Sequence, residues 1–149
     1  MSIRFYGMSK PNPKYWPFSN FYRASFRFNG VIWKTSEHAY QAMKSPISAI
    51  QETIRLLKSP REAADMGRSL NLIVEDWDNR KYGFMVEILF AKFSQNPCLK
   101  TLLIETGEEE IIEDSPTDWI WGCGKDGKGQ NLLGKALMEV RSRFIEESQ

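Results

Sequence analysis

A short helix is predicted for residues 36–44 within the stretch Thr35-Ser36-Glu37-His38-Ala39-Tyr40-Gln41-Ala42-Met43-Lys44. Positions i, i+3, i+4 and i+7 of an α-helix share one face, at about 100° per residue. In this stretch that face carries an acid, a phenol, an amide and an amine, namely Glu37, Tyr40, Gln41 and Lys44. The opposite side carries Ala39, Ala42 and Met43. Polar side chains thus occupy the stripe that is normally apolar, and a cleft beside this stripe would be a candidate active site.

The two ends of this polar stripe are spaced for a ligand. Glu37 and Lys44 lie two helical turns apart, about 10 Å along the axis, which is too far for a direct ion pair. The spacing suits an acid and an amine on either side of a sugar-sized ligand. A solvated face is the commoner arrangement for Glu and Lys, but Tyr40 and Gln41 between them favour a site.

The composition is typical of one globular domain. The 149 residues fit a single domain spanning residues 1–149, which is long enough to bury an ordinary core. Hydrophobic residues make up 42% and charged residues 26%, as in soluble proteins. The formal net charge of +1 gives no whole-protein field toward nucleic acid or an anionic membrane. A nucleic-acid substrate would have to be held by local contacts.

The sequence gives little support for a metal site or a disulfide framework. Cys98 and Cys123 are too few for a disulfide framework, and His38 is the single histidine, so no zinc-site spacing occurs. A nucleophile pair of Cys123 with His38 is a formal alternative. Residues 1–7 lack the features of a signal peptide, and no run approaches a membrane span. We expect a cytoplasmic protein without membrane contact, metal or other cofactor.

The strand signals are few and short. Phe26 and Phe28 alternate with polar neighbours, and Asn29-Gly30 then precedes Val31-Ile32-Trp33. Asn-Gly favours a type I′ turn, whose two central positions need positive φ, so an antiparallel hairpin is predicted for residues 24–33. Further strands are predicted at residues 3–6, 111–112 and 119–121, and a proline-rich loop from Lys10 to Pro17.

Helices account for most of the remaining chain. Ser59-Pro60-Arg61-Glu62 is a capping box with proline at the first helical position, and Gly67 is expected to end that helix. The other predicted helices run from after Pro46 to about Lys58, over residues 76–95 and 97–106, and onward from a cap at Asn131. Helices and strands do not alternate, so the pattern predicts a single α+β domain, helix-rich around a small antiparallel sheet.

Residues 122–129 form a glycine-rich loop with two lysines, before the helix capped by Asn131. Glycine lets backbone N–H groups approach an anion, and a helix N-terminus attracts phosphate. The loop matches neither the P-loop nor the dinucleotide-binding pattern, so a phosphate cradle and a plain surface loop both stay open. Arg68 and Lys81 are further candidate phosphate partners, although solvated charges are commoner.

Two aromatic segments are candidate ligand walls. Asp118-Trp119-Ile120-Trp121 would place both tryptophans on one face of a strand, where one could stack a base. A core position is the commoner fate, and we prefer it for Trp119. The segment Pro17–Tyr22 packs aromatics around Asn20, an arrangement that presents an amide to a ligand or serves as satellite core.

Six motifs follow one another along nearly the whole chain. They are Pro17-Phe18-Ser19-Asn20-Phe21, Gly30-x-x-Trp33-x-Thr35-Ser36-Glu37-His38-x-Tyr40-Gln41-Ala42-x-Lys44, Ala63-Ala64-x-Met66-Gly67-Arg68, Asp76-Trp77, Ala91-Lys92-Phe93 and Trp121-Gly122-x-Gly124-x-Asp126-Gly127-x-Gly129-x-Asn131-x-Leu133-Gly134. Taken in this order, the motifs resemble those of the NADAR (YbiA-like) family. Ser45 departs from the pattern, because an aromatic residue is common there in the family, and Pro46 then ends the helix. That departure concerns the pocket wall rather than the catalytic pair.

The resemblance implies cleavage of an N-glycosidic bond on a ribose by a helix-rich fold around a small sheet. Lys44 is then expected to capture C1′ of a ring-opened ribose as a Schiff base, with Glu37 as acid and base. In a simpler version Glu37 alone is catalytic and Lys44 only contacts the substrate. Substrate contacts are expected from Asn20, Phe21, Trp33, Tyr40, Gln41, Arg68, Lys81, Asp118, Trp121, Gly122, Gly127, Gly129 and Asn131.

The same resemblance implies two substrate classes. The preferred one is ADP-ribose attached to guanine bases, so the expected partner is ADP-ribosylated DNA or RNA. The alternative is a phosphorylated ribosylaminopyrimidine intermediate of riboflavin biosynthesis. A non-catalytic ADP-ribose-binding module is a third possibility, which the presence of both Glu37 and Lys44 disfavours.

Overall fold

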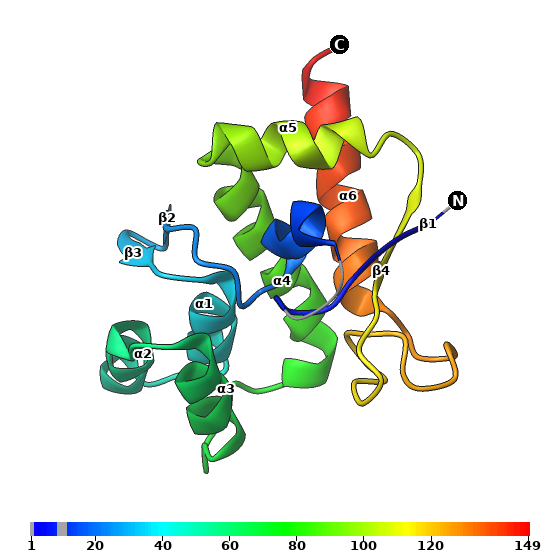
Figure 1. Cartoon of the computed structure of the whole chain (residues 1–149). Helices are drawn as coiled ribbons and strands as arrows, with labels where there is room; N and C mark the ends of the chain where they lie inside the picture. The colour runs from blue at the N-terminus through cyan, green and yellow to red at the C-terminus, as the bar shows by residue number, and fades with distance from the viewer. Residues whose placement is uncertain (1, 9–11) are drawn as a thin grey trace.

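Two long helices, α4 (Trp77–Ser94) and α6 (Leu132–Glu147), pack against each other at the centre of the molecule (Figure 1). The computed structural model describes residues 2–8 and 12–149. Both helices bury apolar faces, which include Met85, Ile88, Leu89 and Phe93 of α4 and Leu133, Leu137, Val140 and Phe144 of α6. The rings of Phe90 and Phe144 stack with centroids 5.0 Å apart. Helix α5 (Pro97–Glu105) contacts both helices at one end.

The polar helix of the sequence is α1 (Ser36–Met43), which lies against α4 and is flanked by α2 (Ser48–Leu56) and α3 (Pro60–Arg68). Thr35 begins α1, because its hydroxyl accepts the backbone N–H of His38 at 3.2 Å. Ser59 begins α3 in the same way, with the N–H of Glu62 at 3.1 Å. Both predicted helix starts are confirmed. Every residue of α1 is buried, polar ones included.

The strands of the described residues form two separate pairs. Strands β2 (Phe26–Phe28) and β3 (Val31–Trp33) make the predicted antiparallel hairpin, and its turn residues Asn29 and Gly30 have φ values of 53° and 81°. Strands β1 (Ser2–Phe5) and β4 (Glu110–Glu113) pair in parallel. The antiparallel expectation therefore holds only for the hairpin. Parallel pairing is possible for β1 and β4 because most of the helices lie in the connection between them.

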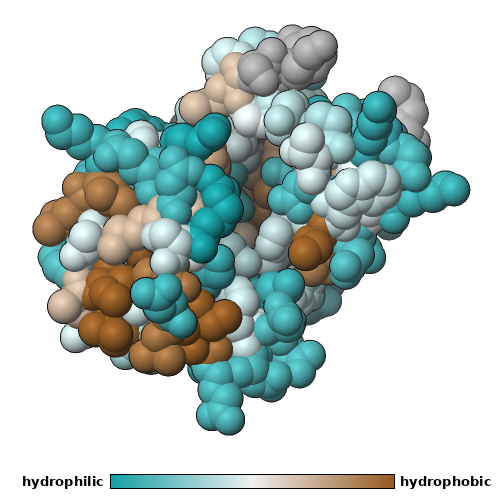
Figure 2. Space-filling model, turned by 90° about the horizontal axis from the view of Figure 1, so that it is seen from below, coloured by the Kyte–Doolittle hydropathy of each residue, from teal (hydrophilic) through white to brown (hydrophobic). Residues whose placement is uncertain are grey.

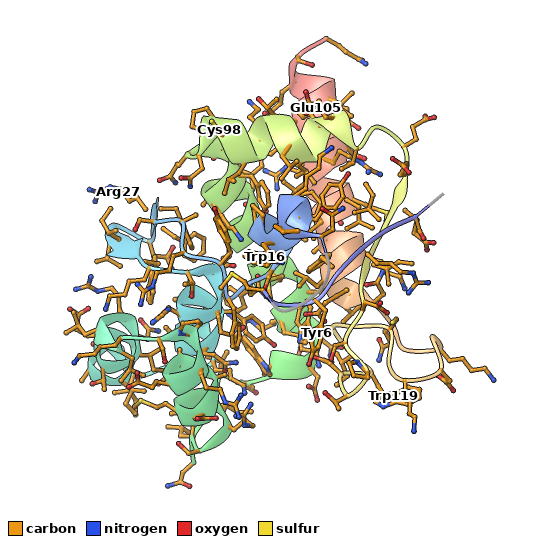
Figure 3. The ribbon with its side chains drawn as sticks, in the orientation of Figure 1. Tyr6, Trp16, Arg27, Cys98, Glu105 and Trp119 are labelled. Carbon is orange, nitrogen blue, oxygen red and sulfur yellow. The ribbon has the colours of Figure 1, made fainter. Side chains whose placement is uncertain are left out.

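The strand predicted at residues 119–121 does not form. These residues follow a turn in which Asp118 Oδ1 accepts the backbone N–H groups of Ile120 and Trp121 at 3.0 and 2.8 Å. This side-chain bonding competes with strand pairing. Trp119 is 47% exposed, so its preferred core assignment is wrong. Figure 3 shows Trp119 at the periphery, on the segment that follows β4.

The described residues bury one main hydrophobic core, to which the β1–β4 pair, the hairpin and helices α1 to α6 all contribute. The helix-rich α+β prediction is confirmed. The predicted loop from Lys10 to Pro17 falls partly outside the described residues, and its described end forms a 3-10 helix, η1 (Pro13–Phe18). Within residues 2–8 and 12–149, no helix is long and apolar enough to cross a membrane.

Candidate active site

A cavity of about 500 Å³ lies beside α1, and the four polar residues of its predicted stripe, Glu37, Tyr40, Gln41 and Lys44, all line it. Figure 2 views the molecule from below and shows a hollow between the two halves of this face. Helix α3 contributes Arg68 to the lining, and the segment after β4 contributes Asp118 and Trp121. The polar stripe of this helix therefore faces a cavity rather than bulk water.

The segment after η1 fixes the start of α1 at this cavity. Asn20 accepts the backbone N–H of Glu37 on its carbonyl oxygen at 3.1 Å, and its Oδ1 accepts the hydroxyl of Ser36 at 2.7 Å. Lys92, fully buried on α4, donates to the carbonyl oxygens of Pro17 and Ser19 at 2.7 and 3.0 Å. Asn20 and Phe21, two of the residues expected to contact substrate, both line the cavity.

Glu37 is a buried carboxyl group with several partners. Its Oε2 accepts a hydrogen bond from Gln41 Nε2 at 2.7 Å. Burial raises the pKa of Glu37, while the Gln41 hydrogen bond and the charges of Lys44 and Arg68 oppose this rise. A carboxyl group shifted toward neutral pH in this way can both give and take a proton.

Lys44 follows the last residue of α1 and its Nζ donates to the carbonyl oxygen of Gly67 at 3.3 Å. Burial lowers the pKa of Lys44, Glu37 opposes the shift, and the nearby cations Arg68 and Lys81 add to it. A lowered pKa increases the neutral amine fraction, which is the nucleophilic form. The opposite shifts of Glu37 and Lys44 are typical of catalytic groups.

Gly67 has a different role from the predicted one. It lies inside α3, which continues to Arg68, so the expected helix end at Gly67 is wrong. A Cβ atom at this position would overlap Oε1 of Gln41. The absence of a side chain at Gly67 therefore leaves room for the Gln41 side chain that donates to Glu37.

Aromatic rings close one side of the cavity. The ring of Tyr40 lies 5.2 Å from that of Trp121 at an angle of 80°, and 5.4 Å from that of Trp77. Burial raises the pKa of Tyr40, so the phenol stays neutral. Tyr40 and Trp121 are thus held as a wall by edge-to-face packing.

Several predicted substrate contacts do not line the cavity. Trp33 is a core residue whose Nε1 donates to the carbonyl oxygen of Phe28 at 2.9 Å. Lys81 pairs with Asp78 at 3.3 Å and acts on Lys44 only through its charge. Neither Trp33 nor Lys81 is therefore among the residues that line this cavity.

The glycine loop and Asn131 also lie outside the lining. Asn131 spans to β4, where its Oδ1 accepts the N–H of Glu113 at 2.9 Å and its Nδ2 donates to the carbonyl oxygen of Ile111 at 2.9 Å. Its side chain therefore supports β4 and does not cap α6. The carbonyl oxygen of Gly122 accepts the N–H of Asn131, and the N–H of Gly129 donates to the carbonyl oxygen of Cys123. Gly127 is exposed. Gly122, Gly127 and Gly129 are therefore not among the residues that line the cavity.

One acidic residue of the lining escaped the sequence prediction. Glu113 is the last residue of β4, and its Oε2 is buried without a hydrogen-bond partner in the described part of the chain. The available signal was an acid directly after the predicted strand Ile111-Ile112, but nothing local indicated that this strand ends at the cavity beside α1.

The alternative of a Cys123–His38 pair is excluded by the bonding of both residues. The ring nitrogens of His38 contact Thr35 Oγ1 at 2.7 Å and the carbonyl oxygen of Leu57 at 3.0 Å. Burial and the neighbouring Asp114 raise the pKa of the Cys123 thiol, which opposes thiolate formation. Among the described residues no group of three His, Cys, Asp or Glu side chains is placed to hold a metal ion.

Comparison with known proteins identifies the family of this chain. A sequence model of the NADAR domain matches residues 4–145. The chain is 41% identical over 148 residues to the N-glycosidase Npun_R5314 of Nostoc punctiforme, covering 97% of this chain and 93% of that protein. It resembles the NMR structure of Escherichia coli YbiA with a TM-score of 0.89 and 38% identity, covering 99% of this chain and 89% of the other.

A third relative belongs to a longer protein. The riboflavin biosynthesis protein PYRR of Zea mays chloroplasts is 38% identical over 144 residues, which cover 86% of this chain and 23% of PYRR. The chain belongs to the NADAR family. It is an enzyme of the N-glycosidase class, a hydrolase acting on N-glycosyl bonds.

Proposed function

We propose that this enzyme releases ADP-ribose from guanine bases of nucleic acid by hydrolysing the bond between C1′ of ribose and a base nitrogen. The observation that carries the proposal is the pair Glu37 and Lys44, which border one cavity from a single helix face. The cavity volume of about 500 Å³ lies within the range of small-molecule sites. The N-glycosidase relatives support the type of bond.

The surroundings of the cavity support a phosphorylated substrate attached to a larger nucleic acid. The Arg68 side chain is 64% exposed beside the cavity, and Lys125 and Lys128 are exposed on the glycine-rich loop. These cations can contact phosphates locally although the whole chain has a formal net charge of only +1. Trp119 and Ile120 are exposed apolar side chains near the cavity, of the kind on which bases stack.

Lys44 is the nucleophile in this proposal. The ribose ring opens as Glu37 gives a proton to the ring oxygen and the base nitrogen forms a double bond to C1′. The neutral amine of Lys44 adds to C1′, and Glu37 takes the proton that the amine loses. The bond from C1′ to the base nitrogen then breaks, and its electron pair leaves with the protonated base. Water adds to the Schiff base at C1′, which restores the amine and releases the sugar.

The second candidate function is hydrolysis of phosphorylated ribosylaminopyrimidine intermediates of riboflavin biosynthesis. The match to PYRR favours it, because that relative is described as a riboflavin biosynthesis protein. The chemistry at Glu37 and Lys44 would be the same, with a small metabolite in place of a nucleic acid. Both reactions suit a cytoplasmic enzyme, as expected from its few cysteines, which are free.

The deciding experiment compares the two substrates. The enzyme is incubated with DNA that carries ADP-ribosyl guanine and with a ribosylaminopyrimidine phosphate, and release of the sugar is followed. Lys44→Ala should reduce turnover on the order of 10⁴-fold, as expected for removal of a nucleophile. Borohydride should trap a sugar adduct on the wild type and not on Lys44→Ala.

Exposed Lys135 on α6 provides the matched control, since Lys135→Ala should leave turnover and trapping unchanged. Undiminished turnover in Lys44→Ala would exclude the Schiff-base route. Binding of ADP-ribose with no turnover of either substrate by the wild type would instead indicate a non-catalytic module.

A further inference from the structure

Glu113 is held rigidly by its backbone at the edge of the cavity. Its N–H donates to Asn131 Oδ1 at 2.9 Å, its carbonyl oxygen accepts the N–H of Cys123 at 2.9 Å, and it pairs in register with Phe5 of β1. These bonds come from the residue before α6, from the following loop and from β1. These backbone hydrogen bonds fix the point from which the Glu113 side chain projects, as is required of a functional side chain.

The Glu113 side chain lines the cavity, and no described protein group satisfies its Oε2. Oε2 is buried and has no hydrogen-bond partner among the described residues. A buried polar atom without a partner is costly, and such atoms in native proteins are often reserved for a ligand or a reaction. A Cβ atom at Gly122 would lie 2.7 Å from this oxygen, so glycine is required there to leave it room.

The charges around the cavity favour a proton on Glu113. Burial raises the pKa of Glu113 to about 8, and the negative charges of Asp118 and Glu37 add to the shift. The cations that line the cavity, Lys44 and Arg68, act instead on Glu37, which also receives the Gln41 hydrogen bond. Of the two carboxyl groups, Glu37 thus has cations and a hydrogen-bond donor that stabilise its charge, whereas Glu113 has neither among the described residues.

We propose that Glu113 is the general acid that protonates the departing base nitrogen, while Glu37 handles the proton of the Lys44 amine. This inference rests on the proposed N-glycoside hydrolysis and assigns to a separate residue the proton that the leaving base needs. The Glu113 O–H bond breaks as the C1′–N bond breaks, and the electron pair of the C1′–N bond goes to the nitrogen that receives the proton. Glu113 is left as a carboxylate and regains its proton from the water that later adds to C1′.

The assignment explains why the described lining of the cavity contains three carboxyl groups. Asp118 is fixed by two backbone N–H donors and its charge keeps the proton on Glu113. Glu37 is paired with Gln41 on the opposite wall. Each carboxyl group therefore has its own function in the proposed reaction, and none is a duplicate.

The test is the dependence on the leaving group. Glu113→Gln and the wild type are compared on the substrate that the wild type cleaves, with and without an electron-withdrawing substituent on the base. General acid catalysis is worth about 10²–10⁴-fold, so Glu113→Gln should lose about 10³-fold in kcat on the parent substrate. A more acidic leaving nitrogen needs less protonation, and there the loss should fall below about tenfold. Binding of ADP-ribose should be unchanged.

Glu110 is the matched control, because it lies exposed on the same strand β4. Glu110→Gln should behave as the wild type with both leaving groups. An equal loss in Glu113→Gln on both substrates would show that Glu113 only contacts the sugar, and would overturn the proposal. If the wild type cleaves no N-glycoside at all, the proposed function fails first, which is a distinct result.

The pH profile gives a second readout that leaves Glu113 in place. The wild type should lose activity as pH rises above about 8, because Glu113 then loses its proton. Removal of the Asp118 charge in Asp118→Asn should lower the pKa of Glu113, so this alkaline limb should move to lower pH. An alkaline limb that is unchanged in Asp118→Asn, or retained in Glu113→Gln, would contradict the assignment.

Discussion

The two walls of the cavity hold their carboxyl groups in opposite ways. On the α1 wall, Glu37 receives a hydrogen bond from Gln41, and Lys44 lies on the same helix face at the other end of α1. On the β4 wall, Glu113 has an oxygen without a partner among the described residues and faces the further negative charge of Asp118. The same residue type is therefore compensated on one wall and uncompensated on the other. In the proposed reaction, this difference would let one site offer both a base and an acid.

After Lys44→Ala and beside Glu113→Gln, the next large effect should come from removing the carboxylate of the α1 wall. Glu37→Gln keeps the shape of the side chain but cannot exchange a proton with Lys44, so kcat should fall about 10³-fold. Steady-state kinetics should show this loss with binding of ADP-ribose retained. Glu105, at the exposed end of α5 and labelled in Figure 3, is the control. Equal turnover in Glu37→Gln and Glu105→Gln would remove Glu37 from the mechanism.

A smaller effect should follow from disturbing the Gln41 hydrogen bond to Glu37 without substituting Glu37 itself. In Gly67→Ala the added Cβ overlaps Gln41 Oε1, and the Gln41 side chain must move away from Glu37. A displacement of this size at a site costs on the order of 10²-fold in turnover. Thermal unfolding should change little, because the clash is with the end of a flexible side chain.

Gly83→Ala is the matched control for this substitution. Gly83 lies in α4 with open space where a Cβ atom would be added, so alanine there should stabilise the helix by up to about 1 kcal/mol. Its turnover should equal that of the wild type. A loss of activity in Gly83→Ala as large as that in Gly67→Ala would mean that helix rigidity, rather than Gln41, is responsible.

The smallest effect should come from the support of the β4 wall. Asn131→Gly removes the bonds to the N–H of Glu113 and the carbonyl oxygen of Ile111. Two backbone groups lose their partner, and the free energy of unfolding should fall by about 2 kcal/mol in denaturant titration. Glycine accepts the φ of 52° at this position, so backbone strain is not introduced.

Asn29 serves as the control for Asn131, because it has nearly the same φ, 53°, in the turn of the hairpin. Its side chain makes a 3.5 Å contact with the sulfur of Met43, which is a weak acceptor. Asn29→Gly should therefore change the free energy of unfolding by less than about 0.5 kcal/mol. Similar losses in both variants would mean that the Asn131 side chain does not support β4.

The α1 wall was predictable because its information is local. Helix periodicity placed Glu37, Gln41 and Lys44 on one face, and the structure places all three on one cavity. The hairpin and the start of α3 were also predictable, because Asn29-Gly30 and the Ser59 capping box act over a few residues.

The β4 wall was not predictable from local pattern. Glu113 reaches the cavity because β4 pairs in parallel with β1, a contact between residues far apart in the sequence. Asp118 fixes a turn where the alternation of Trp119 and Trp121 indicated a strand, since its side chain takes up the backbone donors. Trp33 was expected to contact the substrate only from the family resemblance, and tertiary packing places it in the core.

The parallel pairing of β1 with β4 also has a consequence for how the enzyme matures during synthesis. Ser2 pairs with Glu110, so closing this contact orders a long intervening chain and is entropically slow. A nascent chain that has emerged only as far as α4 contains Lys44 but not β4, so Glu113 is absent from it. In the proposed reaction such a chain lacks the acid for the leaving base. We therefore expect hydrolysis to begin only after β4 has been synthesised and has paired with β1.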